Sequence, residues 1–306
     1  MNMPIKPLIK GFLSYSPLKS LVVRKGTGGT NSARYCYSVW LRHLVLLYQN
    51  GMRSHPKIVA ELGPGDSLGI GLAALISGAE KYYAFDVVRH THLKSNINIF
   101  GELVSLYKVK APIPDENEFP EIQPKINSYS FPEYLFDKSY LDNSKLEKIK
   151  NNLRGGASDT IQYIVPWYAA DELKNETVDL VFSQAVMEHV IKLENAYKAM
   201  YKYLKKDGYI SHQIDYKAHE THKVWNGHWN YNNLLWKIIM HGRSYPINRK
   251  THLEHIKKII QAGFTIKNVL KVERNDGYKS SNLPVKYSQL NSEDMATASA
   301  HIIAQK

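Results

Sequence analysis

The chain has 306 residues, of which 43% are hydrophobic and 22% charged, and this composition excludes a disordered or collagen-like protein. Its 40 basic and 28 acidic residues give a formal net charge of +12, which favours anionic partners in general, and the single cysteine, Cys36, excludes an internal disulfide. No run approaches the roughly 20 apolar residues of a membrane-spanning helix, so we expect a protein of the reducing cytoplasm.

The first 55 residues are predicted to form an N-terminal arm with one helix. Residues 1–25 mix apolar side chains with lysines and prolines and lack a continuous apolar block, so we expect no secretory signal. Their basic, partly apolar character would allow contact with the inner face of an anionic membrane, and the alternative is an arm packed on its own domain. Residues 33–49 are predicted to form the helix, ended by Gly51.

The next segment alternates strands and helices around a glycine-rich turn. Residues 57–62 form a short apolar run that is typical of a buried parallel strand, and the turn Gly63–Ser67 follows it. A helix is predicted at 68–77 and a second strand at 81–87, with Asp86 near its carboxyl end. Strand, turn and helix in this order open a nucleotide-binding unit.

An insertion is predicted after the helix at 90–108. Five prolines between residues 111 and 132 disfavour both a helix and a central strand. A helix at 142–153 and a strand at 160–165 follow. Because long irregular insertions in compact domains are usually functional or disordered, we expect residues 111–156 to form a cap over the substrate side of the site.

The second half predicts two more parallel strands and a different ending. Strands are expected at 178–183 and 209–214, and the basic stretch 198–206 has the spacing of an amphipathic helix with solvent-facing lysines, so nucleic acid is not the expected partner. After a helix at 251–262, two strands at 264–272 and 297–304 have no helix between them and must pair antiparallel. The predicted class is α/β.

The glycine turn and Asp86 are the candidate cofactor site. Gly63 and Gly65 let the backbone approach a ligand, and the helix that follows offers free N–H groups and a positive dipole to an anion. Asp86 lies 21 residues beyond Gly65, where a carboxylate can accept hydrogen bonds from ribose hydroxyls. Together with the antiparallel tail, these features predict a cofactor of the adenosine type.

The chain resembles the class I S-adenosylmethionine (SAM)-dependent methyltransferases over about residues 57–304, through VAELGPGDS, YAFDV, VDLVFSQAVMEHV, LKKDGYI and the terminal GF with two strands. The resemblance implies a seven-stranded Rossmann-like domain over residues 56–306, with SAM as cofactor. It also implies cofactor contacts from the glycine turn, the second-strand acid and residues after the third and fourth strands: Glu61, Gly63, Pro64, Gly65, Ser67, Asp86, Asp171 and Ser183. For Asp171 the alternative is a cap of a helix or turn.

The stretches NSARYCYSVWLRHL and PGDSLGIGLAALISGA look like a type 11-like branch that includes proteins encoded with bacterial surface-polysaccharide genes. The residues after the fourth strand, SQAV, lack the (N/D)PP(Y/F) turn of base N-methyltransferases. Ala185 stands where metal-binding relatives have the first carboxylate of Glu-x-x-Glu-His, so we expect no catalytic metal; the alternative is a metal ion whose ligands are completed by His212 or His219.

A hydroxyl acceptor needs a base, and His189 is predicted to be that base because it follows the fourth strand. An imidazole near its unperturbed pKa of about 6.5 is mostly neutral at pH 7. Asp215, at the end of the fifth strand, is predicted to orient His189 or to act as the base itself. The alternative is that His189 only caps a helix or packs.

Residues 217–231 hold three histidines and two tryptophans just beyond the fifth strand, where ligands of open α/β sheets bind. Trp225 and Trp229 are expected to pack on sugar faces, and His228 and Arg243 to bind hydroxyl or acidic groups; the alternative is that the tryptophans are core. The sequence thus predicts an O-methyltransferase acting on a sugar hydroxyl of a glycan or glycan precursor. The alternatives are a small-molecule or RNA O-methyltransferase, or a catalytically inactive SAM-binding partner subunit.

Overall fold

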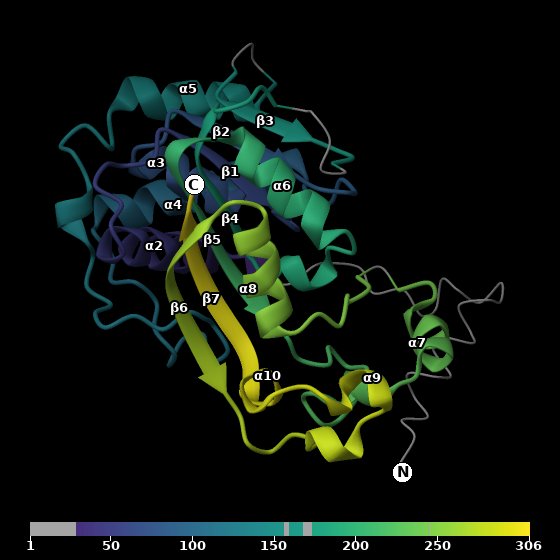
Figure 1. The fold of residues 1–306 in the computed structure, drawn as a ribbon. Helices are drawn as coiled ribbons and strands as arrows, with labels where there is room; N and C mark the ends of the chain where they lie inside the picture. The colour runs from purple at the N-terminus through teal and green to yellow at the C-terminus, as the bar shows by residue number, and fades with distance from the viewer. Residues whose placement is uncertain (1–28, 156–158, 168–172, 244) are drawn as a thin grey trace.

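The computed structural model describes residues 29–155, 159–167, 173–243 and 245–306. Its sheet has seven strands in the order β3-β2-β1-β4-β5-β7-β6 (Figure 1). Strand β7 runs antiparallel to β5 and β6, and the other neighbouring pairs are parallel. The predicted fold class, with its antiparallel C-terminal strand, is confirmed. The strands are β1 (Ile58–Leu62), β2 (Lys81–Phe85), β3 (Ile161–Ile164), β4 (Val178–Gln184), β5 (Leu204–Asp215), β6 (Thr265–Glu273) and β7 (Thr297–Gln305).

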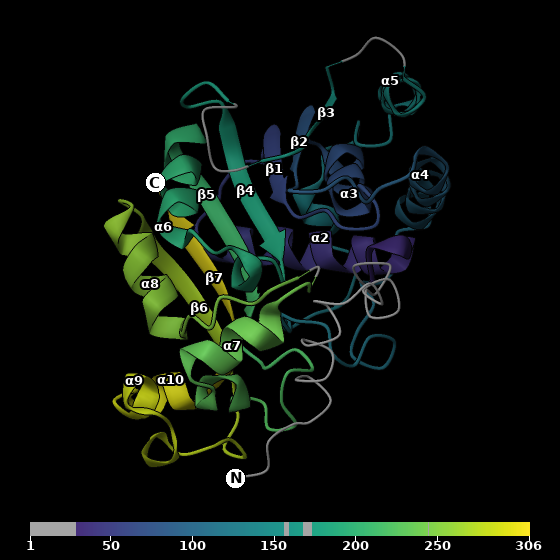
Figure 2. The same ribbon diagram turned by 90° about the vertical axis from the view of Figure 1, so that its right-hand side faces the viewer.

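Helices cover both faces of this sheet (Figures 1 and 2). One face carries α2 (Ala33–Gln49), α3 (Gly69–Ser77), α4 (Leu93–Lys108) and α5 (Asn143–Leu153), and the other carries α6 (Leu193–Tyr203) and α8 (His252–Gln261). Three shorter helices, α7 (Asn233–Met240), α9 (Val285–Ser288) and α10 (Ser292–Ala296), lie toward the end where the parallel strands finish. The site predicted from the sequence is at this end.

Helix α2 belongs to the central core. Ser32 caps its N-terminus by accepting a hydrogen bond from the Tyr35 N–H group at 3.3 Å. The helix is buried on almost every side, and Trp40 packs against β4 while α3 and α4 pack against the helix itself. The division of the chain at residue 55 stays a prediction, but α2 shares one core with α3 and β4. Residues 1–28, for which membrane contact was predicted, lie outside the described part.

Buried histidines line both faces of the sheet near β5 and β7. His43 of α2 places Nδ1 2.7 Å from Ser211 Oγ, and the same hydroxyl lies 3.0 Å from His301 Nε2 of β7. On the other face, His212 and His255 are equally enclosed. Burial lowers the pKa of these four imidazoles, so all are neutral at pH 7.

The predicted insertion lies against α2 and is tied to it by a buried arginine. The guanidinium group of Arg42 donates to the carbonyl oxygens of Pro114 at 2.8 Å and Pro124 at 2.6 Å, and its side chain is fully buried. Residues 118–123 reach the carboxyl ends of β4 and β5, whereas α5 packs against α4 and β3. Whether the insertion acts as a cap stays a prediction.

Two details of the C-terminal half differ from the prediction. The connection between β6 and β7 contains α9 and α10, where no helix was expected, but these short helices do not cross the sheet, so the strands still pair antiparallel. Strand β5 begins at Leu204 rather than 209, because Asp207 adopts a φ of +63° and the pairing with β4 shifts register there. Lys205 and Lys206 consequently belong to a strand.

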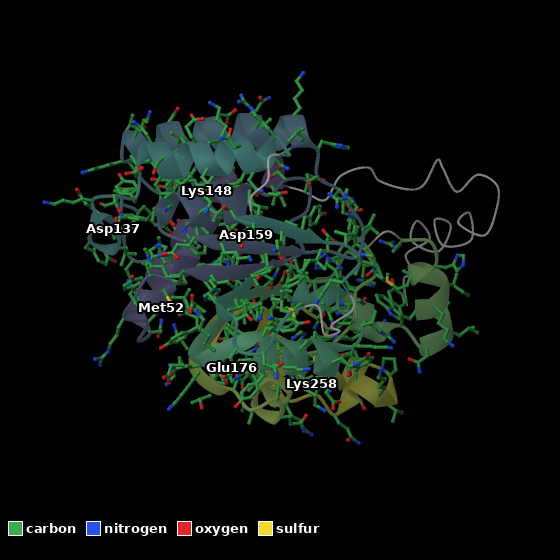
Figure 3. All side chains as sticks on the ribbon, turned by 90° about the horizontal axis from the view of Figure 1, so that it is seen from above. Met52, Asp137, Lys148, Asp159, Glu176 and Lys258 are labelled. Atoms are coloured by element: carbon green, nitrogen blue, oxygen red, sulfur yellow. The ribbon has the colours of Figure 1, made fainter. Side chains whose placement is uncertain are left out.

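Figure 3 views the molecule from the opposite end, where the parallel strands begin and where Met52, Asp159 and Glu176 lie. Within the described ranges, we find no helix whose length and apolar character suffice to cross a membrane.

Candidate active site

The turn after β1 can be built only with glycine at two positions. Gly63 and Gly65 have φ angles of +64° and +74°, in the left-handed region that favours glycine. A Cβ atom on Gly63 would lie 2.7 Å from the side chain of Val186, which follows β4. The Gly63 N–H group donates to Phe85 O at 2.8 Å. The turn is therefore a tight glycine cradle held between the ends of β2 and β4, where backbone can come close to a ligand.

Asp86 lies directly against this cradle. Its carboxylate accepts hydrogen bonds from the N–H groups of Val87, at 2.7 Å, and Gly65. Burial raises the pKa of Asp86, and these backbone donors oppose that effect. The structure thus brings the second-strand acid and the glycine turn together, and a half-buried carboxylate at this place fits the hydroxyl pair of a ribose.

Glu61 turns away from the cleft. It is 1% exposed, accepts a hydrogen bond from the Tyr82 hydroxyl at 2.5 Å and another from the Gly71 N–H group in α3. Burial raises the pKa of Glu61 to about 8. Its contacts lie within the protein, and its predicted role toward the cofactor stays a prediction.

The remaining predicted cofactor residues serve local structure in this state. Ser67 Oγ accepts from the Gly69 N–H group at 3.0 Å and donates to Thr30 O, so it ties the start of α3 to the segment before α2. Ser183 Oγ is fully buried and lies 2.8 Å from His212 Nδ1. Pro64 is buried within the turn, and Asp171 lies outside the described residues.

Tyr245 covers the cofactor end of the cleft, and no sequence signal singled it out. Its hydroxyl lies 3.4 Å from His90 Nε2, and its ring centroid is 6.0 Å from that of His189. Burial raises the pKa of Tyr245, and the nearby carboxylates of Asp66 and Asp86 raise it further. Tyr245 therefore spans the segments that follow β2 and β4.

His189 presents one ring nitrogen as a free acceptor. Its Nδ1 lies 3.2 Å from Pro246 O, and because a carbonyl oxygen can only accept, the hydrogen is on Nδ1 and Nε2 carries the lone pair. Burial lowers the pKa of His189 to about 4, and His219 lowers it further. The expectation of an unperturbed pKa near 6.5 is wrong because the ring is largely enclosed.

Asp215 lies beside His219, a pairing that the sequence analysis did not predict. Asp215 accepts a hydrogen bond from the Lys217 N–H group at 2.8 Å, and its Oδ2 lies 3.7 Å from His219 Nε2. His219 lies between Asp215 and His189, with its ring centroid 5.4 Å from that of His189. The spacing Asp215-x-x-x-His219 after a strand was the signal that could have found it.

A pocket of about 380 Å³ lies between the insertion and the carboxyl ends of β4 and β5. Carboxylates, amides, one lysine and aromatic rings line it. The lining residues are Tyr35, Glu118, Phe119, Pro120, Glu121, Ile122, Gln123, Gln184, Ala185, Gln213, Asp215, Lys217 and Ser299. Among the predicted site residues, this pocket includes Asp215.

The tryptophans predicted to bind a sugar form a small core instead. Trp229 is 0% exposed, packs with Trp225 and Tyr287, and donates from Nε1 to Arg249 O at 3.2 Å. This correction has a physical reason: the unexpected helices between β6 and β7 cover both rings. His228 is buried beside Trp229, and burial lowers its pKa well below the usual value.

Arg243 is half-buried and donates from Nε to Ile239 O at 2.9 Å. Its predicted contact to a substrate stays a prediction. Among the described residues, no three His, Cys, Asp or Glu side chains are arranged to hold a metal ion.

Residues 139–211 match the family model described as a methyltransferase domain. No curated protein matches the chain. Among solved structures, the chain is similar to a SAM-dependent methyltransferase from Methanosarcina mazei, at 12% identity over 85% of this chain and 96% of that chain, with a TM-score of 0.46. A SAM-dependent methyltransferase from Mesorhizobium loti is 12% identical over 86% of this chain and 96% of that chain, with a TM-score of 0.44. These likenesses are distant, and the fold assignment rests on the sheet order itself.

Proposed function

We propose that this chain is a SAM-dependent methyltransferase that methylates a hydroxyl group of a sugar in a glycan or glycan precursor; the family-model match at residues 139–211 and the sheet order support the methyltransferase class. The single observation that carries the acceptor class is the pocket at the ends of β4 and β5, where hydrogen-bonding side chains are set in an apolar lining. The likeness of two sequence stretches to enzymes of bacterial surface-polysaccharide gene clusters agrees with it.

The pocket suits a molecule with many hydroxyl groups. Gln213 Oε1 has no partner among the described residues and offers an acceptor, Asp215 accepts and Lys217 donates, while the ring of Phe119 offers an apolar face. The Gln184 amide is already bonded to Gln123 O and His43 Nε2, so it shapes the pocket wall. A hydrophobic acceptor would leave these polar groups without partners, at a cost of about 1 to 3 kcal/mol each. This lining takes over the role that the sequence assigned to Trp225 and Trp229.

The acceptor pocket and the cofactor turn meet at the end of β4. Ala185 lines the pocket, and the next residue, Val186, contacts Gly63 of the cradle. SAM supplies a methyl group on a positively charged sulfur when it is bound. Placing a hydroxyl in line with that methyl is most of what the protein must do, because correct orientation removes much of the barrier.

A base must also take the hydroxyl proton. His189 has a free Nε2 and fits the role assigned from the sequence, while Asp215 lines the acceptor pocket directly. Both groups follow strands whose ends face the cleft. We propose that catalysis uses one of these two groups, and general-base loss lowers kcat by about 10² to 10⁴.

Methyl-labelled SAM tests this function. The purified chain is incubated with carbohydrate extract and, separately, with RNA, and the label is followed through mild alkali, which removes methyl esters and leaves methyl ethers. We expect alkali-stable label in the carbohydrate pool. Label that appears in RNA and disappears with ribonuclease would favour the RNA alternative, and binding of SAM without any transfer would favour the inactive partner subunit.

A further inference from the structure

A group of three polar side chains, with Glu188 buried and Asp215 and His219 half-buried, lies beside the pocket. His219 Nε2 is 3.7 Å from Asp215 Oδ2 and 3.9 Å from Glu188 Oε1. That nitrogen and both Glu188 oxygens are buried without a well-formed hydrogen bond among the described residues, although the backbone N–H groups of Glu188 and Asp215 lie near the Glu188 carboxyl group. Because nearly all buried polar atoms in proteins have a partner, such atoms gathered in one place point to hydrogen bonds that form at another stage of the reaction.

The backbone is strained to hold His219 at this position. His219 and Glu220 have φ angles of +43° and +61°, which cost on the order of 1 kcal/mol each in residues other than glycine. The turn is closed by a hydrogen bond from the Thr221 N–H group to Ala218 O at 2.8 Å. Strain of this kind persists where the surrounding structure imposes it, and it does so preferentially at functional sites.

The charges of the group favour uptake of one proton. Burial raises the pKa of Glu188 well above its usual range, and the Asp215 carboxylate raises it further, which favours the uncharged form of Glu188. When Glu188 is uncharged, the negative charge of the group lies on Asp215. A proton on His219 makes the group neutral, while Lys217, 3.4 Å from Asp215, holds the carboxylate in place.

We propose that the proton released by the methyl acceptor passes through Asp215 and ends on His219, with Glu188 as a positioning residue. This inference rests on the proposed O-methyl transfer. The O–H bond breaks as the new O–C bond forms, and the C–S bond breaks and leaves its electron pair on sulfur. The proton moves to the Asp215 carboxylate, which lines the pocket, and then to His219 Nε2.

Activity of His219 variants tests the proposal on the carbohydrate pool that the wild-type enzyme labels. His219→Asn keeps the strained turn, since asparagine tolerates a positive φ, and we expect kcat to fall at least 100-fold with SAM affinity within twofold. His219→Gly leaves space for free imidazole, which should restore activity with imidazole's own pH dependence. The matched control is His222→Asn in the same turn, with kcat within threefold of wild type. A kcat for His219→Asn near the wild-type value, or no rescue of His219→Gly by imidazole, would overturn the proposal.

A second measurement does not depend on the acceptor. The nitrogen-15 shifts of the His219 ring in the S-adenosylhomocysteine complex report which nitrogen carries hydrogen. We expect hydrogen on Nδ1 alone, because Nε2 must be free to accept; hydrogen on Nε2 would contradict the proposal. Absence of label with the wild-type chain would refute the proposed function instead, so the two failures are distinguishable.

Discussion

At Gly63 the backbone conformation and the space beside the cofactor turn both require glycine. Gly63→Ala would place a methyl group against Val186 in a backbone conformation that alanine avoids. We expect a loss of about 1 to 3 kcal/mol in the free energy of unfolding and weaker SAM binding. Urea unfolding and titration calorimetry measure the two effects.

Gly101 provides the control for this substitution. It lies within α4 and has no positive φ, and a Cβ atom added there would meet no heavy atom of a neighbouring element within 4 Å. Gly101→Ala should leave SAM affinity unchanged and stabilise the protein by up to about 1 kcal/mol, because alanine favours a helix. If Gly63→Ala and Gly101→Ala lost the same SAM affinity and the same free energy of unfolding, glycine at position 63 would not be required by the turn.

Removing the Asp86 carboxylate tests whether this group binds the cofactor. Asp86→Ala should weaken SAM binding by about 1.5 to 3 kcal/mol, the range for hydrogen bonds to a charged group, with little change in the thermal midpoint. Asp159→Ala, at the opposite end of the sheet, is the control (Figure 3). Unchanged SAM affinity in Asp86→Ala would place the ribose elsewhere.

Arg42 makes two of the buried hydrogen bonds that join helix α2 to the insertion. Arg42→Met keeps the length of the side chain but leaves Pro124 O without its buried donor and leaves Pro114 O with the Ser38 hydroxyl alone. We expect a loss of about 3 kcal/mol in the free energy of unfolding, and faster proteolysis within residues 111–141.

The control is Arg34→Ala, which removes an exposed ion pair to Glu118 and should cost less than about 1 kcal/mol. Proteolysis of both variants with and without SAM shows whether the insertion responds to the cofactor. Identical cleavage of Arg42→Met and the wild-type chain would mean that the arginine does not hold the insertion.

The elements themselves could largely be read from the sequence. The helix at 33–49 and the strand at 178–183 have a periodicity and caps that depend on neighbouring residues alone, and the structure has them within a residue. Pairings between distant segments could not be read. Trp229 is core because the β6–β7 connection folds over it, and Tyr245 reaches the cleft from a loop with no distinctive pattern.

For the molecule as a whole, buried histidines predict a steep loss of stability in acid. The folded-state pKa values are lowered to about 4 or less for His43, His212 and His255, and well below the usual value for His301. The unfolded chain therefore binds these four protons first, from about pH 6.5 downward. This stability is fully present above pH 6.5 and is lost as the pH falls toward 4.

Two buried carboxyl groups act in the opposite direction. The raised pKa values of Glu61 and Glu188 make the folded state bind their protons first, so they add stability as the pH falls. The histidines with lowered pKa values outnumber these two carboxyl groups, because burial also lowers the pKa of His55, His189 and His228, so unfolding takes up protons between pH 6 and 5 and stability falls there. Urea unfolding at pH 7, 6 and 5 measures this slope, and His43→Asn should reduce it. A flat dependence would show that these histidines are not enclosed in solution.

The contact between α2 and β7 also constrains how the chain reaches its native state. His43 and His301 meet although 258 residues separate them, and β7 fills the gap between β5 and β6. Loops of that length must close before the contacts they allow can form, and such non-local topology slows folding. Until β7 is inserted, β6 has no partner strand and His43 of α2 lacks its contact with His301. Synthesis of the last strand is thus the step that commits the chain to its fold, and an incomplete chain exposes apolar surface that favours aggregation.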